Sequence, residues 1–504
     1  MGLVIRFEFL ALFLFFLLMF INYEADHHIH LHSSIDAPAD IGVDDHSAAK
    51  RLPLATPAIL KYGGIVLATD KPSIQIWEQP NPRNTAKYVP QMRAEISLES
   101  TARVSPDRRA IEISSGIDNH QDELICVVTR SLAVLVFKNE HLLWESHLPV
   151  FLADGSEAIE MTCQVLPFPI HKGDVGSVFV VGRFENNEHN YHHLDSFMFD
   201  SETGRLRWKH QKGDFHEGQH TDGPISQFDL ADAHDGEQDW RLYSKSLFQY
   251  LPLRFTRSND LAVEVGRLSR GEITEGIANV IIIKSEEGLE ALHIYSGRMV
   301  TRIPLTTHML HADVDGDEVI EHVFLTASKY GQSKETRVVC SGDIPPIIEK
   351  WDIDLADTYD EIKDAGIVYS TTPIMWADEE MVVTVLNSGR VTAIDWTGEI
   401  VWSTLIGTTS TSVVHTFNND RLIIATESGS ESSVYVLSKK GKLLGTHNTN
   451  RPIIALESIE NTNYIIASGL DHFELLFMED NKMDSMVSLI FLFFTFVVGL
   501  SIVS

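Results

Sequence analysis

The chain has 504 residues, of which 44% are hydrophobic, and a formal net charge of −31. This length fits two or three average domains, or one large all-β barrel or propeller. The acidity argues against nucleic-acid binding, because a phosphate backbone is held by clustered lysine and arginine, and it favours a soluble surface that attracts cations. Cys126, Cys163 and Cys340 lie in or beside apolar runs. They allow at most one disulfide and are typical of buried thiols.

Residues 1–23 have the pattern of a secretory signal. Arg6 precedes an apolar run from Phe9 to Ile21, and polar residues follow it. Those residues give only half of a small-x-small cleavage pattern, so both a cleaved signal peptide and a retained signal-anchor stay open. Residues 24–48 contain the histidine-rich segment DHHIHLH, which we interpret as a solvated linker. Binding of a transition metal is the alternative.

From residue 49 to residue 480 the chain repeats one pattern of short strands, turns and, often, a tryptophan. Copies include GGIVLATDKPSIQIWE at 63–78, ELICVVTRSLAVLVFKNEHLLWESHL at 123–148 and MVVTVLNSGRVTAIDWTGEIVWSTLIG at 381–407, and NYIIASGLDHFELLFME at 463–479 is a last partial copy. Such runs predict strands and hairpins, and a recurring multi-strand unit predicts propeller blades. At roughly 40–50 residues per blade, we predict an all-β propeller of about seven blades closed around a channel.

Tryptophans recur at one place in this pattern, shortly after a turn. Trp144, Trp208, Trp351 and Trp402 occupy equivalent positions. Large rings at a structural period predict packing between neighbouring sheets rather than a ligand site.

The longest interruption of the pattern is an insertion at about 213–274. Its first half is polar and predicts a loop. In its second half Tyr243, Leu247 and Tyr250 lie near helical spacing before Pro252, which predicts a short amphipathic helix. Loops on a rigid ring commonly carry binding sites, so the insertion is a candidate surface for partners.

Residues 311–323, HADVDGDEVIEHV, have the layout of a calcium loop, because a hard cation needs several oxygens converging from one short turn. The predicted metal ligands are the side chains of Asp313, Asp315, Asp317 and Glu321 and the backbone carbonyl of Val319. Glu318 occupies the sixth position, where glycine normally relieves the sharp turn. We predict that calcium (Ca2+) binds here in a structural role; the alternative is an acidic turn without a fixed ion.

Residues 486–503 form an uncharged apolar run, whose length predicts a transmembrane helix with little tilt. A lipid-anchor signal is disfavoured, because it needs a polar spacer before the tail and Ser485 adjoins the run directly. With a signal or anchor at one end and a span at the other, we expect residues 24–485 on the luminal or extracellular side. The membrane is that of the secretory pathway or the cell surface.

The loop HADVDGDEVIEHV resembles the calcium-binding loop of FG-GAP repeats, the units of the integrin α-subunit propeller. With the TGRLRWKH turn at 203–210 and the two apolar ends, the chain is similar to FG-GAP repeat-containing membrane proteins of plants and protists. The specific part of the resemblance is residues 279–323, and the rest is blade pattern. The resemblance implies a luminal propeller between a signal or anchor and a C-terminal span, with a binding or assembly role.

Several catalytic patterns are absent from the sequence, among them the G-x-S-x-G elbow, the phosphate-cradling glycine loop and C-x-x-C. We therefore predict no catalytic or cofactor-binding residue and interpret the chain as an interaction scaffold for protein or glycan ligands. Two alternatives stay open. The Gly-x-x-x-Trp turns also resemble those of quinoprotein oxidoreductases, and a chaperone-type maturation factor of the secretory pathway fits the same architecture.

Overall fold

The structure is a computed structural model of residues 1–504. It describes residues 29–38, 55–69, 71–78, 91–99, 107–149, 156–170, 173–186, 191–211, 214–216, 240–253, 261–269, 278–305, 309–327, 336–342, 349–355, 373–376, 381–407, 411–417, 420–428, 431–449, 451–459, 462–469 and 472–480. The predicted signal or anchor and the predicted transmembrane helix lie outside these ranges. Among the described helices, none is long and apolar enough to cross a membrane.

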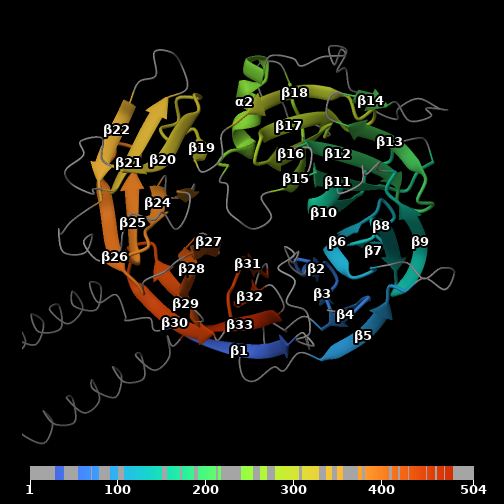
Figure 1. Cartoon of the computed structure of the whole chain (residues 1–504), viewed down its shortest axis with the longest axis horizontal. Helices are drawn as coiled ribbons and strands as arrows, with labels where there is room; N and C mark the ends of the chain where they lie inside the picture. Colours follow the sequence, from blue (N-terminus) through green and yellow to red (C-terminus); the bar gives the residue numbers. More distant parts are fainter. Residues whose placement is uncertain are drawn as a thin grey trace, which may run out of the picture.

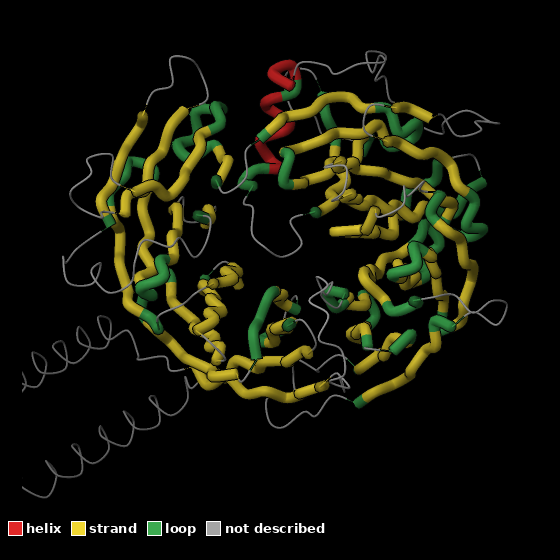
Figure 2. Tube along the Cα trace, in the orientation of Figure 1, coloured by secondary structure: helices red, strands yellow, loops and turns green. Residues whose placement is uncertain are grey.

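The described strands form eight antiparallel sheets arranged in a ring (Figure 1, Figure 2). Seven of these blades use strands that are consecutive in the chain. Blade 1 holds β2 (Ala58–Leu60), β3 (Gly64–Ala68), β4 (Ser73–Trp77) and β5 (Met92–Ser97); blade 2 holds β6 (Ala110–Ile117), β7 (Glu123–Thr129), β8 (Ala133–Lys138) and β9 (His141–His147). Blade 3 holds β10 (Ser156–Leu166), β11 (Ser177–Asn186), β12 (Tyr191–Asp200), β13 (Leu206–Gln211) and β14 (Asp214–His216).

The next four blades follow the same order, with the first strand of each nearest the centre of the ring. Blade 4 holds β15 (Ala262–Gly266), β16 (Val280–Ser285), β17 (Gly288–His293) and β18 (Met299–Pro304); blade 5 holds β19 (Leu310–Ala312), β20 (Glu321–Ala327), β21 (Thr336–Gly342) and β22 (Glu349–Asp354). Blade 6 holds β23 (Ile374–Trp376), β24 (Met381–Val385), β25 (Arg390–Asp395) and β26 (Ile400–Leu405); blade 7 holds β27 (Thr411–Phe417), β28 (Arg421–Ser428), β29 (Glu431–Ser438) and β30 (Leu443–Thr449).

Blade 8 closes the ring with strands from both ends of the described chain. It holds β31 (Ala455–Ser458), β32 (Tyr464–Ser468), β33 (His472–Asp480) and, as its fourth strand, β1 (Ile29–Pro38). β1 runs antiparallel to β33, with Ile29 opposite Asp480 and Pro38 opposite His472. The first and last described strands therefore share one ladder of backbone hydrogen bonds, and this pairing ties the two ends of the ring together.

The sheets confirm the predicted all-β propeller and correct three details. The ring has eight blades rather than about seven. The stretch 24–48, which we expected to be a linker, contains strand β1. β1 is the fourth strand of the last blade, so the partial copy at 463–479 belongs to a complete blade. The insertion predicted at 213–274 ends earlier, because β15 is already the first strand of blade 4.

Within the insertion, the predicted amphipathic segment forms three short helical turns. These are η1 (Trp240–Leu242), α2 (Ser244–Leu247) and η2 (Phe248–Tyr250). Tyr243, Leu247 and Tyr250 are buried in one hydrophobic cluster with blade 4. Leu253 then forms an isolated bridge to His311 of blade 5, so the segment fills the junction between these two blades.

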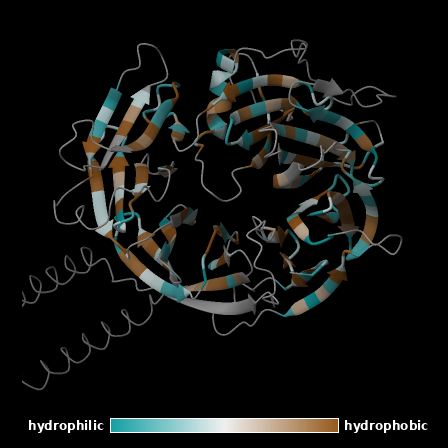
Figure 3. Ribbon diagram, viewed as in Figure 1, coloured by the Kyte–Doolittle hydropathy of each residue, from teal (hydrophilic) through white to brown (hydrophobic). Residues whose placement is uncertain are grey.

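The hydrophobic core lies between the blades. Val128 and Val136 of blade 2, for example, pack in one cluster with Val180 and Phe197 of blade 3. The middle strands of a blade are covered on both faces by the neighbouring blades, which explains why strands such as β24 are apolar except for Thr384 and buried at every position. Figure 3 accordingly shows hydrophobic residues along the strands of all the blades.

Tryptophan rings join neighbouring blades, as the sequence predicts. Trp208 of blade 3 covers Gly297, in the turn before the last strand of blade 4, so closely that a Cβ on Gly297 would lie 2.4 Å from the ring. The Trp208 indole N–H donates to the carbonyl of Ile294 at 3.1 Å. Equivalent pairs are Trp144 with Gly204, Trp351 with Gly398 and Trp402 with Gly441. Each glycine has a positive φ, so these positions require glycine both for conformation and for space.

We expect Gly297→Ala to destabilise the protein more than Gly173→Ala. Both glycines have a positive φ, but nothing lies within 4 Å of a Cβ placed on Gly173. The control therefore measures backbone strain, roughly 1–2 kcal/mol, whereas Gly297→Ala also forces the Trp208 ring aside, at an added cost of about 1–3 kcal/mol. Thermal unfolding of the full chain in detergent measures the difference. Equal midpoints for the two variants would contradict tight packing of the ring on the turn.

A buried glutamate on an inner strand makes stability depend on pH. Glu112 of β6 is buried, and Thr162 Oγ1 donates to its Oε1 at 3.2 Å. Burial, reinforced by the nearby charge of Glu457, raises the pKa of Glu112 from 4.5 to about 8. Between these values the folded state holds a proton that the unfolded state has lost. This contribution to stability is complete below 4.5 and is lost as the pH rises through about 8.

We therefore expect the melting midpoint of the full chain to fall between about pH 5 and about pH 9, and to fall less in Glu112→Gln, which has no proton to lose. Burial likewise raises the pKa of Glu457 to about 7. Combining Glu112→Gln with Glu457→Gln should therefore flatten the profile further. Parallel profiles for the parent and Glu112→Gln would refute a buried, protonated Glu112.

Candidate cation-binding loop

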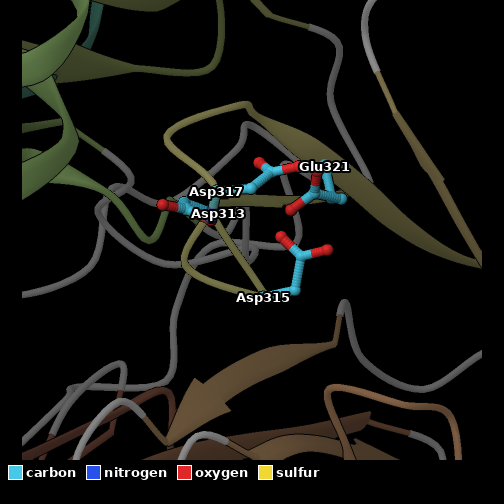
Figure 4. Close-up of side chains that lie close together, drawn as sticks. All are labelled: Asp313, Asp315, Asp317 and Glu321. Atoms are coloured by element: carbon cyan, nitrogen blue, oxygen red, sulfur yellow. The ribbon is translucent and has the colours of Figure 1, made fainter.

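The acidic loop predicted from the sequence joins the first two strands of blade 5. In the hairpin of β19 and β20, Ala312 lies opposite Glu321. Four carboxylates lie close together there (Figure 4), with one potential ligand atom of each within 4.8 Å of the others. They belong to Asp313, Asp315, Asp317 and Glu321. The structure thus brings together all four side chains that the sequence predicts as ligands; Val319 lies in the same loop.

Asp313 organises the backbone of the turn. Its Oδ1 accepts hydrogen bonds from the N–H groups of Gly316 at 2.8 Å and Asp317 at 3.1 Å, and its Oδ2 accepts one from Glu318 at 3.0 Å. Asp317 continues the pattern, since its Oδ1 accepts from the N–H of Val319 at 2.9 Å. Short acidic side chains that bond to nearby backbone amides are a standard means of fixing a tight turn.

Two residues of the loop adopt the left-handed conformation, Gly316 with φ 78° and Glu318 with φ 64°. The second is the position at which the sequence departs from the usual glycine. A non-glycine residue there costs on the order of 1–2 kcal/mol. The Glu318 carboxylate lies 3.4 Å from Nζ of Lys245 in α2, so the loop also contacts the helical segment of the insertion.

Glu321 is the buried member of the cluster, with a side chain that is 0% exposed. Its Oε2 accepts a hydrogen bond from the N–H of Val314 at 2.8 Å. Burial raises the pKa of Glu321, and the hydrogen bonds from Lys350 and Val314 offset this only in part. A carboxylate in such a place requires a positive partner, because an unpaired buried charge is strongly unfavourable.

That partner is Lys350 of β22, which the sequence analysis did not identify. Its Nζ lies 2.7 Å from Asp315 Oδ2, 3.1 Å from Asp317 Oδ2 and 2.8 Å from Glu321 Oε1. Burial lowers the pKa of Lys350, but its hydrogen bonds to the three carboxylates outweigh this and raise the pKa above its usual range. The chain therefore supplies a cation of its own to the acidic loop.

A β-bulge places Lys350. Cys340 lies opposite Trp351 and Ser341 opposite Glu349, so Lys350 is the extra residue of β22. Blade 3 has the same arrangement: Arg207 is the extra residue immediately before the blade tryptophan, and it pairs with Asp174 and Asp200. In the sequence, a basic residue directly precedes two of the four blade tryptophans, Trp208 and Trp351, and this is the one local feature that marks Lys350.

The oxygen donors of the loop suit a hard cation, which calcium is. An ion at the cluster would compete with the Lys350 ammonium for Asp315, Asp317 and Glu321. A calcium ion at the cluster would require the ammonium to move away, so the two cations would exclude each other there. Calcium as the occupant stays a prediction.

The three cysteines are buried free thiols in the structure, in agreement with the expectation from their apolar surroundings. Burial raises the pKa of Cys340 to about 12. Because the thiolate is the reactive form, this thiol is suited to packing rather than to chemistry.

The segment HEGQH at 216–220 has the spacing of a zinc-protease motif, which needs both histidines on one face of a helix. His216 is instead the last residue of strand β14. The other residues of the segment lie outside the described ranges. The described part of the chain therefore gives the motif no support.

No protein-family model matches the chain, and no curated protein matches its sequence. Solved structures with a similar fold include BamB from Moraxella catarrhalis, at 12% identity over 90% of this chain and 98% of that one, with a TM-score of 0.42. The C-terminal WD40 domain of Sif2 shares 10% identity over 89% of this chain and 98% of that one, with a TM-score of 0.44. At such identities and scores these likenesses carry no argument about function.

We expect Lys350→Met to strengthen calcium binding, because the uncharged side chain no longer competes for the three carboxylates. Titration calorimetry of the full chain in detergent should show an affinity at least about tenfold higher, equivalent to roughly 1.4 kcal/mol. The matched control is Lys245→Met, which removes a charge beside the loop but outside the cluster.

Asp315→Ala should abolish binding in the Lys350→Met background. Absence of calcium binding in both the parent and Lys350→Met would show that the loop is an acidic turn neutralised by lysine alone.

Proposed function

We propose that this chain is a membrane-anchored propeller that acts as an interaction scaffold for protein or glycan ligands, on the luminal or extracellular side of a secretory-pathway or cell-surface membrane. The propeller is established by its own sheets. The anchor, the compartment and the ligands constitute the proposal.

The pairing of β1 with β33 carries this proposal. Ile29 is the first residue of β1, and it lies opposite Asp480, the last residue of β33. In the sequence, the apolar run Phe9–Ile21 precedes Ile29 and the apolar run at 486–503 follows Asp480. Both predicted membrane segments therefore join the ring at one corner of blade 8.

Short stretches separate this corner from the apolar runs. They are residues 22–28 on one side and residues 481–485 on the other. Because one extended residue spans about 3.5 Å, these stretches reach at most roughly 25 Å and 18 Å. A bilayer that holds either run would therefore lie close to blade 8.

The opposite arc of the ring is then free to meet a ligand. Blade 4 and the helical segment at 240–250 lie across the ring from β1 (Figure 1). A rigid ring that is tethered at one blade and presents loops at another has the layout of a scaffold rather than of an enclosed site.

Calcium in the loop of blade 5 and membership of the FG-GAP repeat proteins belong to the same proposal. The three alternating aspartates and the convergence of the four carboxylates support both. The ion would have a structural role, since the residues around it are already used in fixing the turn.

The resemblance to quinoprotein turns has a structural explanation. In the Gly-x-x-x-Trp segments at 204–208 and 398–402, the glycine receives the tryptophan of the preceding blade and the tryptophan covers the glycine of the next. Packing between blades accounts for this pattern, so it gives no separate support for a redox cofactor.

Two experiments with the full chain test the proposal. The first extracts membranes that contain the chain at alkaline pH, and the second captures ligands with the solubilised chain. We expect the chain to stay with the membrane pellet at alkaline pH, because an apolar span is not extracted with peripheral proteins. Complete release into the supernatant would refute the anchor.

Solubilised full chain should then retain a small, reproducible set of surface or matrix proteins or glycoproteins, and fewer of them in chelator than in calcium. Asp315→Ala is the matched control and should behave in calcium as the parent does in chelator. Recovery of folding machinery with immature clients would favour the maturation factor instead. If nothing is retained in either buffer, the scaffold function is wrong.

A further inference from the structure

The outer strand of blade 6 exposes an apolar surface. Ile400, Val401 and Leu405 of β26 are 46%, 53% and 58% exposed, and Trp396, in the turn before this strand, is 50% exposed. The intervening Trp402 is buried on the next blade. None of these four side chains belongs to the hydrophobic clusters of the described residues in this part of the ring.

A basic turn adjoins this surface. Thr404 of β26 donates a hydrogen bond to the carbonyl of Gly441. That glycine lies in the turn between β29 and β30, which exposes Lys439, Lys440 and Lys442 and is followed by the exposed Leu443. Three lysines in one turn stand out in a chain with a net charge of −31. Glu399, in the neighbouring turn, is an exposed acid at the edge of the same surface.

The propeller places the Trp396 end of this surface, and the lysine turn, on the side where the chain ends leave the ring, whereas Leu405 lies at the other end of β26, opposite Arg390. In blades 6 and 7 the third and fourth strands are joined by the turns that carry Trp396 and the lysines. In blade 8 the third strand ends at Asp480 and the fourth begins at Ile29, so this corner occupies the position of the same turn.

Neighbouring blades support this equivalence. Val436 of blade 7 lies opposite Gly445, at the register position where Ala393 of blade 6 lies opposite Trp402. Blade 7 thus has no tryptophan at this position. Its neighbour, blade 8, has no turn between its third and fourth strands on which such a tryptophan could pack. β26, β30 and β1 follow one another along the outer edge of the ring (Figure 1, Figure 2).

We infer that these side chains form a membrane-facing patch that rests on the phospholipid headgroups of the luminal or extracellular leaflet. We call it the rim patch; its members are Trp396, Ile400, Val401, Leu443, Lys439, Lys440 and Lys442. The inference rests on the proposed membrane anchor, which would hold a bilayer within roughly 25 Å of the adjoining corner.

The composition of the rim patch fits this occupant. Tryptophan favours the interface between headgroups and acyl chains, and aliphatic side chains gain by burial at that boundary. Lysines are attracted to the phosphate groups of lipid headgroups over about one Debye length, so they act only on a surface that is already close. The basic turn gives the net-acidic propeller one orientation in which its contact with the lipid headgroups is favourable.

Tryptophan fluorescence in brominated lipid tests the inference. The full chain is placed in nanodiscs of dibrominated phosphatidylcholine, with or without phosphatidylserine. The predicted membrane segments contain no tryptophan, so the signal comes from the propeller. We expect quenching that increases with phosphatidylserine and is mostly lost in Trp396→Tyr, which keeps an interfacial aromatic ring but removes the indole signal.

Replacing Lys439, Lys440 and Lys442 together by glutamine should remove most of the increase due to phosphatidylserine. Lys245→Gln, across the ring, is the matched control and should leave it unchanged. Equal quenching in the parent and Trp396→Tyr overturns the rim patch. The rim patch is also overturned if a bound protein partner, and not the lipid, covers Trp396. If the chain enters the discs but Trp396 is not quenched, the proposed membrane anchor stands and the rim patch is refuted. If the chain does not enter the discs, both the anchor and the rim patch are refuted.

Discussion

The pairing of β1 with β33 is the constraint on which the rest of the structure depends. A propeller has no central core, and each blade is stabilised by the two beside it, so a ring left open would expose two apolar faces. Blade 8 prevents this by hydrogen-bonding the first described strand to the last. The same pairing brings Ile29 beside Asp480. The closure that completes the fold therefore also decides where both ends of the chain leave it.

Between blades, the recurring contact is a tryptophan ring on a glycine of the next turn. It needs an indole on one blade and, on its neighbour, a residue without a side chain in a left-handed conformation. Where either half is missing the contact is missing, as in blade 7, where Gly445 takes the register position that Trp402 has in blade 6. The tryptophans report packing, and the one exposed to half of its area, Trp396, is the exception that points outward.

The acidic loop of blade 5 shows how charge is balanced within a rigid frame. Asp313 bonds to the backbone of the turn, and Glu321 is buried below it. Lys350 forms ion pairs with three of the four carboxylates from a bulged strand that the loop does not include. An internal ammonium and an external metal ion satisfy the same electrostatic requirement. The geometry therefore makes the affinity for calcium depend on a lysine far away in the sequence.

The sequence by itself determined the strand pattern, the all-β propeller, the packing role of the tryptophans and the four carboxylates of the loop. These depend on local periodicity and on residues close together in the chain, which a reader of the sequence sees directly. Tertiary structure alone decided the blade count and the position of Lys350. β1 belongs to a blade whose other strands lie at the opposite end of the chain, and Lys350 meets the loop only through strand pairing. Both are contacts between segments that are separated in the chain. The partner of β1 is fixed only when the ring closes, and Lys350 reaches the loop only when β20, β21 and β22 pair within blade 5.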